Sequence, residues 1–265
     1  MQFPLYIPIG PLAFHPHWVF EALAYLVGAR LYVWLKARTG DPIAADDRWT
    51  VIAAAALGAG IGDKLLFWAS EPWFALDHVR DPLVLLGGKS IVGALAGGLL
   101  AVELVKRRAG INRSTGDVFA IPLAVGIGIG RIGCFLTGLD DHTHGLPAAL
   151  PWAVDYGDGI LRHPAQLYEV GFVWLLAVVL ALVARRPHRE GDVFRLFMCA
   201  YMIFRFGLEF LKPGLAFGGL NAIQWVCIAV LAYYASVGLR NADFRFRIGA
   251  RRDPLPLDGG GSGWG

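Results

Sequence analysis

Charged residues are scarce in this 265-residue chain. Asp, Glu, Lys and Arg together make up 17% of it, against roughly a quarter of an average soluble domain. Hydrophobic residues make up 56%, and the mean hydropathy is +0.51. These figures argue strongly against a soluble globular protein, and the many aromatic residues exclude a solvated, disordered coil.

Cysteine is equally scarce. The three cysteines, Cys134, Cys199 and Cys227, all lie in apolar stretches and lack the paired spacing of a disulfide framework or a zinc knuckle. The 34 glycines show no three-residue period, which excludes a collagen helix.

Long apolar runs dominate what remains. A bilayer core about 30 Å thick needs roughly 20 mostly apolar residues per helix. Seven windows meet this requirement: residues 18–36, 50–69, 82–105, 117–138, 166–184, 193–212 and 220–237. We therefore predict an all-α integral membrane protein with seven transmembrane helices. The first window contains Glu21 and Arg30 and no small-residue cleavage site, so we expect a retained helix and no cleaved signal peptide.

Basic residues alternate between loops in a way that predicts orientation. Fifteen lie in the loops after the first, third and fifth windows and in the tail: Lys36, Arg38, Arg48, Lys106, Arg107, Arg108, Arg113, Arg185, Arg186, Arg189, Arg240, Arg245, Arg247, Arg251 and Arg252. The other loops hold only Arg80, Arg162 and Lys212. The positive-inside rule then places the N-terminus outside and the C-terminus in the cytoplasm. Because the basicity is explained by topology, we expect no nucleic-acid partner.

The chain divides simply. We predict one membrane domain over residues 1–240, with a periplasmic loop at 139–165, and a cytoplasmic tail at 241–265. The Gly-rich end, residues 258–265, is expected to be disordered.

Several ionisable residues fall inside or near the ends of the apolar windows. They are Glu21, Arg30, Asp63, Lys64, Lys89, Arg131, Glu169, Arg205 and Glu209. Each costs about 2.5–3.5 kcal/mol at the centre of a bilayer on insertion scales. Either they neutralise one another, or they line a water-accessible polar cavity, which we favour.

Arg131 and Arg205 are the first candidates for binding the phosphate of an anionic lipid. A guanidinium stays charged at any depth and can bond a phosphate through two N–H groups. The alternative is a helix-to-helix salt bridge to Glu169 or Glu209. Asp63 and Lys64 are adjacent in the sequence and point about 100° apart, so we expect each to need a partner on another helix.

Residues 128–133, GIGRIG, match the dinucleotide-binding fingerprint letter by letter. No strand precedes them and the surroundings are apolar, so nucleotide binding is not expected. We interpret these glycines as small residues that let helices approach closely. The same interpretation applies to Gly58, Gly60, Gly62, Gly93 and Gly97.

Two further segments contain side chains capable of chemistry. Residues 140–144, DDHTH, have side chains that suit a metal site or a general base, and such clusters are also common in solvated loops. Of these alternatives we do not favour the metal site, and we expect the protein to use no metal or other cofactor. Residues 163–169, HPAQLYE, open the fifth window, where Pro164 suits a helix start and Gln166 and Glu169 share a face. The alternative is an interfacial cap with Tyr168 in the aromatic belt.

Three motifs together make the chain resemble the prolipoprotein diacylglyceryl transferase family. They are G-R-I-G-x-F-x-x-G at 130–138, R-H-P-x-Q-L-Y-E at 162–169 and F-R-x-x-x-E-F at 204–210. The resemblance implies seven helices in the bacterial inner membrane, an outside N-terminus and a site toward the outer face. It also implies transfer of a diacylglyceryl group from phosphatidylglycerol to a lipobox cysteine thiol, with release of glycerol phosphate. Arg131 and Arg205 would bind the head group and stabilise the departing phosphate.

The chain departs from the family pattern at several positions. Val92 stands where the family usually has a histidine, Cys134 replaces an asparagine, and Leu139 replaces an acid. Glu21 stands where a tyrosine is expected, and Asp63 with Lys64 falls in an altered glycine-arginine stretch. We therefore hypothesise that the donor half of the site is retained and the acceptor half rebuilt.

That hypothesis assigns roles by residue. Arg131 and Arg205 are the predicted catalytic arginines, and Glu21, Lys89 or His144 is the predicted base in place of the missing histidine. The predicted substrate-binding residues are Arg131, Arg205, Glu209, His163, Gln166, Tyr168, Glu169, Cys134, Asp63 and Lys64. The expected partners are phosphatidylglycerol or a similar anionic phospholipid, a prolipoprotein or other acceptor, and the bilayer.

Three functions remain open from the sequence. The first is the family reaction on a lipoprotein cysteine. The second is the same donor half-reaction with another acceptor, such as a sugar, a small alcohol or a lipid. The third is a phospholipid-binding or transport protein that performs no chemistry.

Overall fold

The computed structural model describes residues 3–81, 85, 87–214 and 216–250, with side chains up to residue 237 except that of residue 9. Helices dominate it. Seven are long: α1 (Pro16–Thr39), α2 (Ala45–Ser70), α5 (Ile91–Ala109), α6 (Asp117–Thr137), α7 (Ala165–Ala184), α8 (Asp192–Leu208) and α9 (Ala222–Ala250). Shorter helical elements whose residues are all described include α3 (Pro72–Asp77) and the 3-10 turns η1 (Gly138–Asp141) and η2 (Glu209–Leu211).

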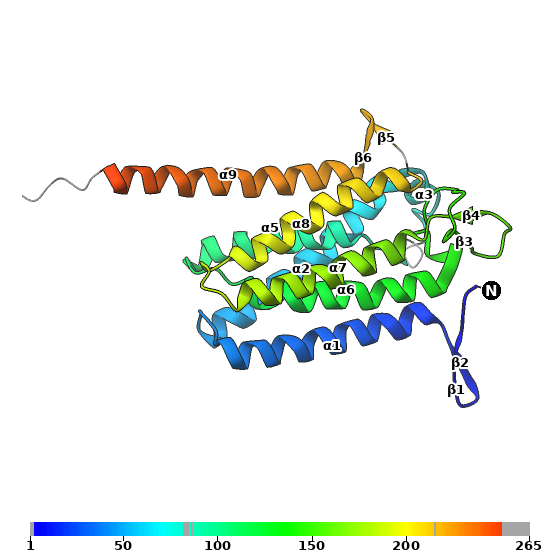
Figure 1. Ribbon diagram of the computed structural model, residues 1–265, viewed down its shortest axis with the longest axis horizontal. Coiled ribbons are helices and arrows are strands. Elements are labelled where there is room, and N and C mark those ends of the chain that lie inside the picture. Colours follow the sequence, from blue (N-terminus) through cyan, green and yellow to red (C-terminus); the bar gives the residue numbers. More distant parts are fainter. Residues whose placement is uncertain (1–2, 82–84, 86, 215, 251–265) are drawn as a thin grey trace, which may run out of the picture.

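Three two-stranded antiparallel hairpins, which the apolar windows did not predict, complete the described part. They pair β1 (Ile7–Ile9) with β2 (Leu12–Phe14), β3 (Val154–Asp155) with β4 (Leu161–Arg162), and β5 (Ala216–Phe217) with β6 (Leu220–Asn221). All three gather at the end of the helix bundle where the chain begins, and the far end of α9 lies at the opposite end (Figure 1). We call these the N-terminal end and the opposite end.

Within the described residues, four helices are long and apolar enough to cross a membrane by length and composition. These are α1, α2, α6 extended to Asp141, and α7. Large apolar side chains face outward on them, including Tyr25, Leu26 and Leu57, each at least 70% exposed. Outward apolar side chains are typical of helices in contact with lipid.

The third predicted span starts later than expected. Residues 82–105 were predicted to form one helix, but α5 begins at Ile91, and its N-cap Ser90 accepts a hydrogen bond from the Gly93 amide at 3.3 Å. Gly87 and Gly88 precede the cap, and glycine disfavours a continuous helix. Residues 82–84 and 86 lie outside the described residues, as does the predicted disordered end at 258–265.

Close helix packing at glycines is confirmed for two pairs on facing helices. An added Cβ on Gly58 or Gly62 of α2 would overlap the backbone of Gly97 or Gly93 of α5. The prediction is wrong for Gly60 and Gly130, where nothing lies within 4 Å of an added Cβ. In α6, an added Cβ on Gly133 would lie 2.6 Å from Phe20 Cβ of α1, so this glycine lets α1 approach α6.

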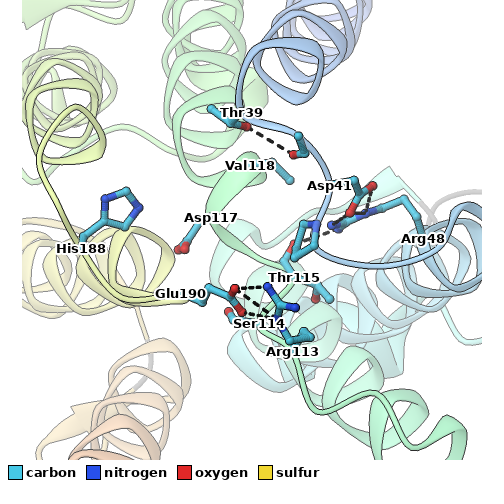
Figure 2. Close-up of a pocket in the computed structure, with 12 residues that line it drawn as sticks. Thr39, Asp41, Arg48, Arg113, Ser114, Thr115, Asp117, Val118, His188 and Glu190 are labelled. Atoms are coloured by element: carbon cyan, nitrogen blue, oxygen red, sulfur yellow. Dashed lines mark hydrogen bonds and ion pairs between the residues drawn. The ribbon is translucent and has the colours of Figure 1, made fainter.

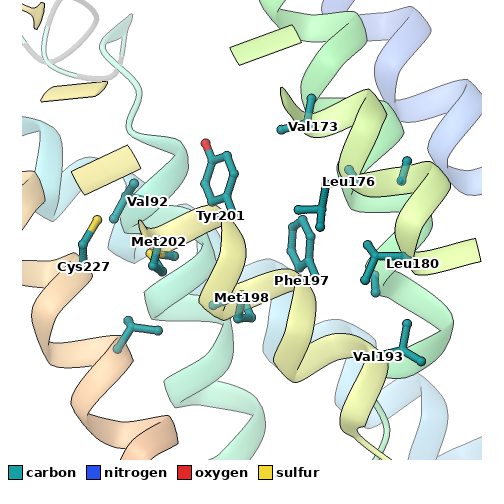
Figure 3. Close-up of a cluster of buried hydrophobic side chains, with 14 of the residues drawn as sticks. Val92, Val173, Leu176, Leu180, Val193, Phe197, Met198, Tyr201, Met202 and Cys227 are labelled. Carbon is teal, nitrogen blue, oxygen red and sulfur yellow. The ribbon is translucent and has the colours of Figure 1, made fainter. Parts of the chain in front are cut away.

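The buried core centres on α8. Phe197, Met198, Tyr201 and Met202 are fully buried between α7, α5 and α9 (Figure 3). Val92 of α5 belongs to this core and is 1% exposed. The side chain at this position therefore packs among apolar groups, and a base cannot be supplied from it.

Candidate active site

A cavity of about 1080 Å³ extends through much of the bundle, between α1, α2, α6 and the segment before α5. At the N-terminal end its lining is rich in ionisable side chains: His17, Glu21, Asp63, Lys89, Arg131, Asp141, Arg205, Glu209 and Lys212. Farther along α1 and α6 the lining becomes apolar: Ala24, Val33, Ile52, Phe119, Leu123 and Ile127. This division between a charged end and an apolar length matches an amphipathic ligand.

The two sequence-predicted arginines meet at one carboxylate. Glu169 Oε2 of α7 lies 2.9 Å from Arg131 Nε of α6 and 3.0 Å from Arg205 Nη1 of α8. Arg205 Nη2 also pairs with Glu209, four residues along the chain. All four side chains are buried, with exposures of 6% or less. The predicted salt bridges to Glu169 and Glu209 are therefore present, and the arginines line the cavity as well.

Neutral side chains hold the two carboxylates in place. Tyr201 donates its hydroxyl to Glu169 Oε1 at 2.6 Å, and Asn221 donates its amide to Glu209 Oε2 at 2.9 Å. Buried carboxylates fixed in this way keep both guanidinium groups in one orientation.

The hydrogen bonding of the arginines is nevertheless incomplete. Arg131 Nε is close to Glu169, but its N–H does not point at the carboxylate, and Arg205 Nε also lacks an acceptor within the described residues. Lys212 lines the same part of the cavity, so three cationic side chains lie there together with Glu169, Glu209 and Asp141. The two Nε–H groups without acceptors are the donors that a further anionic group would meet.

The ionisable residues on the other side of the cavity pair with one another. Lys89 Nζ lies 2.5 Å from Glu21 Oε1, which also accepts from Tyr25 at 3.3 Å. Lys64 lies 3.2 Å from Asp63 and donates to the Gly88 carbonyl at 2.5 Å.

Asp63 in turn accepts the Ser90 amide N–H. Asp63 and Lys64 therefore pair with each other and hold the segment before α5, where separate partners on other helices had been expected. Of this group, Glu21, Asp63 and Lys89 line the cavity, and Lys64 is not among the lining residues.

The predicted residues of the long loop and the start of α7 form a separate network. His144 Nδ1 lies 3.1 Å from the Gly145 carbonyl, and His163 Nδ1 lies 3.2 Å from the Tyr168 hydroxyl. Gln166 accepts from Tyr156 at 3.0 Å. None of His144, His163, Gln166 and Tyr168 is among the cavity-lining residues.

Burial raises the pKa of Tyr156 to about 12, although its hydrogen bond to Gln166 acts against the rise, so the hydroxyl stays a donor. This network ties the loop to α7 and does not join the arginine cluster.

Two residues that sequence reasoning did not assign to the site lie beside Cys134. Cys134 Sγ is 3.8 Å from Arg131 Nη1, and ligand-capable atoms of His17, Cys134 and Asp141 all lie within 4.8 Å of one another. His17 falls one residue before the first predicted span, and Asp141 was considered only with its loop neighbours. Their contact spans 124 positions, so no local spacing could have revealed it.

A second, smaller pocket of about 370 Å³ lies at the opposite end of the bundle (Figure 2). There Arg48 of α2 is 1% exposed. Its Nε and Nη2 donate to Asp41 at 2.9 and 2.6 Å, and its Nη1 donates to the Thr115 carbonyl at 2.9 Å. Partial burial raises the pKa of Asp41, but hydrogen bonds from Arg48 and Lys36 outweigh it and lower the pKa to about 2.

Comparison with known proteins connects this chain to one family. A family model described as prolipoprotein diacylglyceryl transferase matches residues 4–239. The chain is 33% identical to the phosphatidylglycerol--prolipoprotein diacylglyceryl transferase of Bordetella avium, over 86% of this chain and 92% of the relative. It is 35% identical to the protein of that name from Nitratidesulfovibrio vulgaris, over 90% and 93% of the two chains. A third such relative, from Geobacter sulfurreducens, is 34% identical over 84% and 88%.

Proposed function

This chain belongs to the prolipoprotein diacylglyceryl transferase family, a family of transferases, and from that premise we propose its reaction. It transfers a diacylglyceryl group from phosphatidylglycerol to the thiol of a lipobox cysteine, and it releases glycerol phosphate. The proposal depends above all on Arg131 and Arg205, which share Glu169 at the charged end of a cavity whose remaining length is apolar.

The phosphate and the acyl chains of phosphatidylglycerol each match one part of this cavity. Guanidinium groups bond phosphate oxygens in pairs, and the apolar length beyond them suits two acyl chains. When the bond between the glyceryl carbon and the phosphate oxygen breaks, negative charge develops on the departing glycerol phosphate. Fixed positive charges in a water-poor site stabilise such a charge most in the transition state. Arg131 and Arg205 are the residues we assign to this task.

The other predicted residues receive supporting roles. Glu169 and Glu209 orient the arginines. Glu21, Lys89, Asp63 and Cys134 line the part of the cavity where the acceptor approaches, and Lys64 fixes the neighbouring backbone. His144, His163, Gln166 and Tyr168 shape the outer loop that the acceptor peptide passes. No cofactor is required by this reaction.

We further propose that the seven long helices all span the inner membrane, with one membrane domain over residues 1–240 and the tail at 241–265 in the cytoplasm. The loops with many basic residues join helices at the opposite end, away from the charged end of the cavity (Figure 1). The positive-inside rule then directs the charged end, and the chemistry, toward the outer face. The same charge distribution argues against a nucleic-acid partner.

A second candidate is the same donor half-reaction with a non-protein acceptor. It is favoured by Val92, which stands where the family usually has a histidine and is buried in the core. The half of the cavity that we assign to the acceptor is lined by Glu21, Lys89 and Asp63, three ionisable residues that suit a polar acceptor.

One experiment separates these functions. Purified protein is incubated with phosphatidylglycerol, with and without a lipobox peptide, and mass spectrometry follows peptide mass and released glycerol phosphate. We expect a diacylglyceryl mass increase on the peptide cysteine. Glycerol phosphate without that increase would favour another acceptor, and neither product would leave phospholipid binding without chemistry as the function.

A further inference from the structure

The start of α1 and the turn after α6 bring a histidine and a carboxylate together at the cavity wall. His17 Nδ1 lies 2.9 Å from Asp141 Oδ1. Asp141 is 8% exposed and also accepts the Thr143 hydroxyl at 2.6 Å, so its position is fixed. The contact depends on the close approach of α1 to α6 at Gly133.

The second ring nitrogen of His17 makes no hydrogen bond within the described part of the chain. When Nδ1–H donates to Asp141, Nε2 carries the free lone pair of the neutral imidazole. Nε2 lies 3.8 Å from Glu21 Oε2, beyond hydrogen-bond length, and Lys89 engages the other oxygen of Glu21. His17 lines the cavity, and its side chain is 27% exposed. A proton acceptor oriented by a buried acid therefore faces the space in which the acceptor substrate would react.

We propose that His17 is the general base of the reaction and that Asp141 positions it; this proposal rests on the function proposed above. His17 Nε2 takes the proton of the acceptor thiol, and the sulfur attacks the glyceryl carbon. The carbon–oxygen bond to phosphate breaks, and its electron pair leaves on glycerol phosphate. The imidazolium then releases its proton to water. The dyad thus supplies the base that Val92 cannot, in preference to Glu21, Lys89 or His144.

The same geometry argues against those three alternatives. Glu21 and Lys89 are 2.5 Å apart and neutralise each other, which weakens either as a base. His144 is not among the cavity-lining residues, and its Nδ1 contacts the Gly145 carbonyl. Of the histidines that line the described cavity, His17 is the one paired with a carboxylate.

A metal held by His17, Cys134 and Asp141 is the competing interpretation of this cluster. His17 and Asp141 already satisfy each other by a hydrogen bond, and the Arg131 guanidinium contacts Cys134 Sγ at 3.8 Å. A metal cation bound to Cys134 Sγ would lie beside the positive charge of Arg131. This repulsion favours the hydrogen-bonded pair of His17 and Asp141 over a metal site.

Five ionisable groups surround His17 and must be considered in any pH test. Asp141 and Glu21 face the ring directly, and Cys134 lies within 4.8 Å of it. Lys89 acts through Glu21, and Arg131 acts through Asp141. Because both direct charged neighbours are carboxylates, loss of one of them makes the imidazole easier to deprotonate.

The first test measures transfer to a lipobox peptide in two variants. We expect His17→Gln to lower kcat about 10²–10⁴-fold, the usual contribution of a general base. Its KM for phosphatidylglycerol should stay within about threefold, since the arginines bind the donor. In the smaller variant His17→Ala, added imidazole should restore part of the rate. His188→Gln, at an exposed histidine of the opposite end, is the matched control and should behave as wild type.

Three results would overturn the proposal. One is wild-type kcat in His17→Gln. Another is loss of activity in His144→Gln that imidazole reverses. The third is loss of wild-type activity on chelation with recovery on added zinc, which would make the cluster a metal site.

A second measurement does not depend on turnover. The carbethoxylation rate of His17 is followed against pH by peptide mass spectrometry in the wild type and in Asp141→Asn. We expect the midpoint of the rate curve to fall to lower pH in the variant, and identical curves would contradict the dyad. If the wild type transfers nothing to the peptide, the proposed acceptor fails, but these curves still decide whether Asp141 acts on His17.

Discussion

Two buried arginines at opposite ends of the bundle use their hydrogen-bond donors differently. Arg48 directs three nitrogens at Asp41 and the Thr115 carbonyl and leaves none without an acceptor. Arg205 directs two nitrogens at Glu169 and Glu209 and leaves Nε without an acceptor in the described part of the chain. Both are almost fully buried, so burial does not separate them. Complete pairing indicates a structural clamp, and incomplete pairing beside a cavity indicates a site that accepts a further anion.

The largest expected effect comes from the incompletely paired end. Arg205→Lys keeps a positive charge but loses the planar group that bonds two oxygens. We expect kcat/KM for diacylglyceryl transfer to fall about a hundred- to a thousand-fold, the usual effect of removing one donor from a transition-state charge. Far-UV circular dichroism in detergent should remain that of the wild type. If Arg205→Lys transferred the diacylglyceryl group as fast as the wild type, Arg205 would be a structural residue like Arg48.

The completely paired end should respond in stability. Arg48→Met leaves Asp41 with one cationic partner, Lys36 at 3.0 Å, and with the Ile43 amide N–H at 3.3 Å, and it leaves the Thr115 carbonyl without its donor. Removing one partner of a buried ion pair costs about 3–5 kcal/mol, and we expect the lower part of that range because Lys36 remains. Denaturant unfolding in detergent measures the loss. Transfer by the folded variant should stay near wild type, and a collapse of kcat without loss of stability would contradict the assignment.

Acid should weaken the same clamp. Folding lowers the pKa of Asp41 from 3.8 to about 2, so the ionised carboxylate stabilises the folded state. That contribution is present above about pH 4 and is lost as the pH falls toward 2. The free energy of unfolding, measured between pH 6 and pH 2.5, should fall more steeply in the wild type than in Asp41→Asn. Parallel curves for the two proteins would show that Asp41 is not the group responsible.

The smallest effect is expected at the rim of the same pocket. Arg113 and Glu190 form an ion pair whose side chains are 58% and 47% exposed. Exposed pairs contribute little because water and salt screen them. Arg113→Met should therefore leave the free energy of unfolding close to that of the wild type, in contrast to Arg48→Met. An equal loss of stability in both variants would mean that exposure does not decide the strength of these two ion pairs.

The sequence alone identifies the charged residues of the candidate site. Arg131, Glu169, Arg205 and Glu209 stand out because charged side chains are rare in apolar windows, and the structure brings all four together. Asp63 and Lys64 stand out for the same reason, but their partners proved to be each other and nearby backbone. The sequence shows that a charged residue lies in an apolar window, but it does not show which partner offsets the free-energy cost of burying that charge.

Other features depended on contacts that no periodicity records. The start of α5 at Ile91 follows from the Ser90 cap and from the hold of Asp63 and Lys64 on the preceding segment. The three hairpins are too short to produce an alternating pattern over several residues. The absence of His144, His163 and Tyr168 from the cavity lining follows from how the long loop folds onto α7.

By itself, the sequence determined the membrane-type composition, the long apolar helices and the charged residues within them, because residue type sets the main part of the transfer free energy. Only the tertiary structure decided which charges are completely paired and which face a cavity. It also decided that His17 meets Asp141 across 124 positions. Hydrogen bonds act over about 3 Å, so their partners are fixed by how the helices pack and not by their order in the chain.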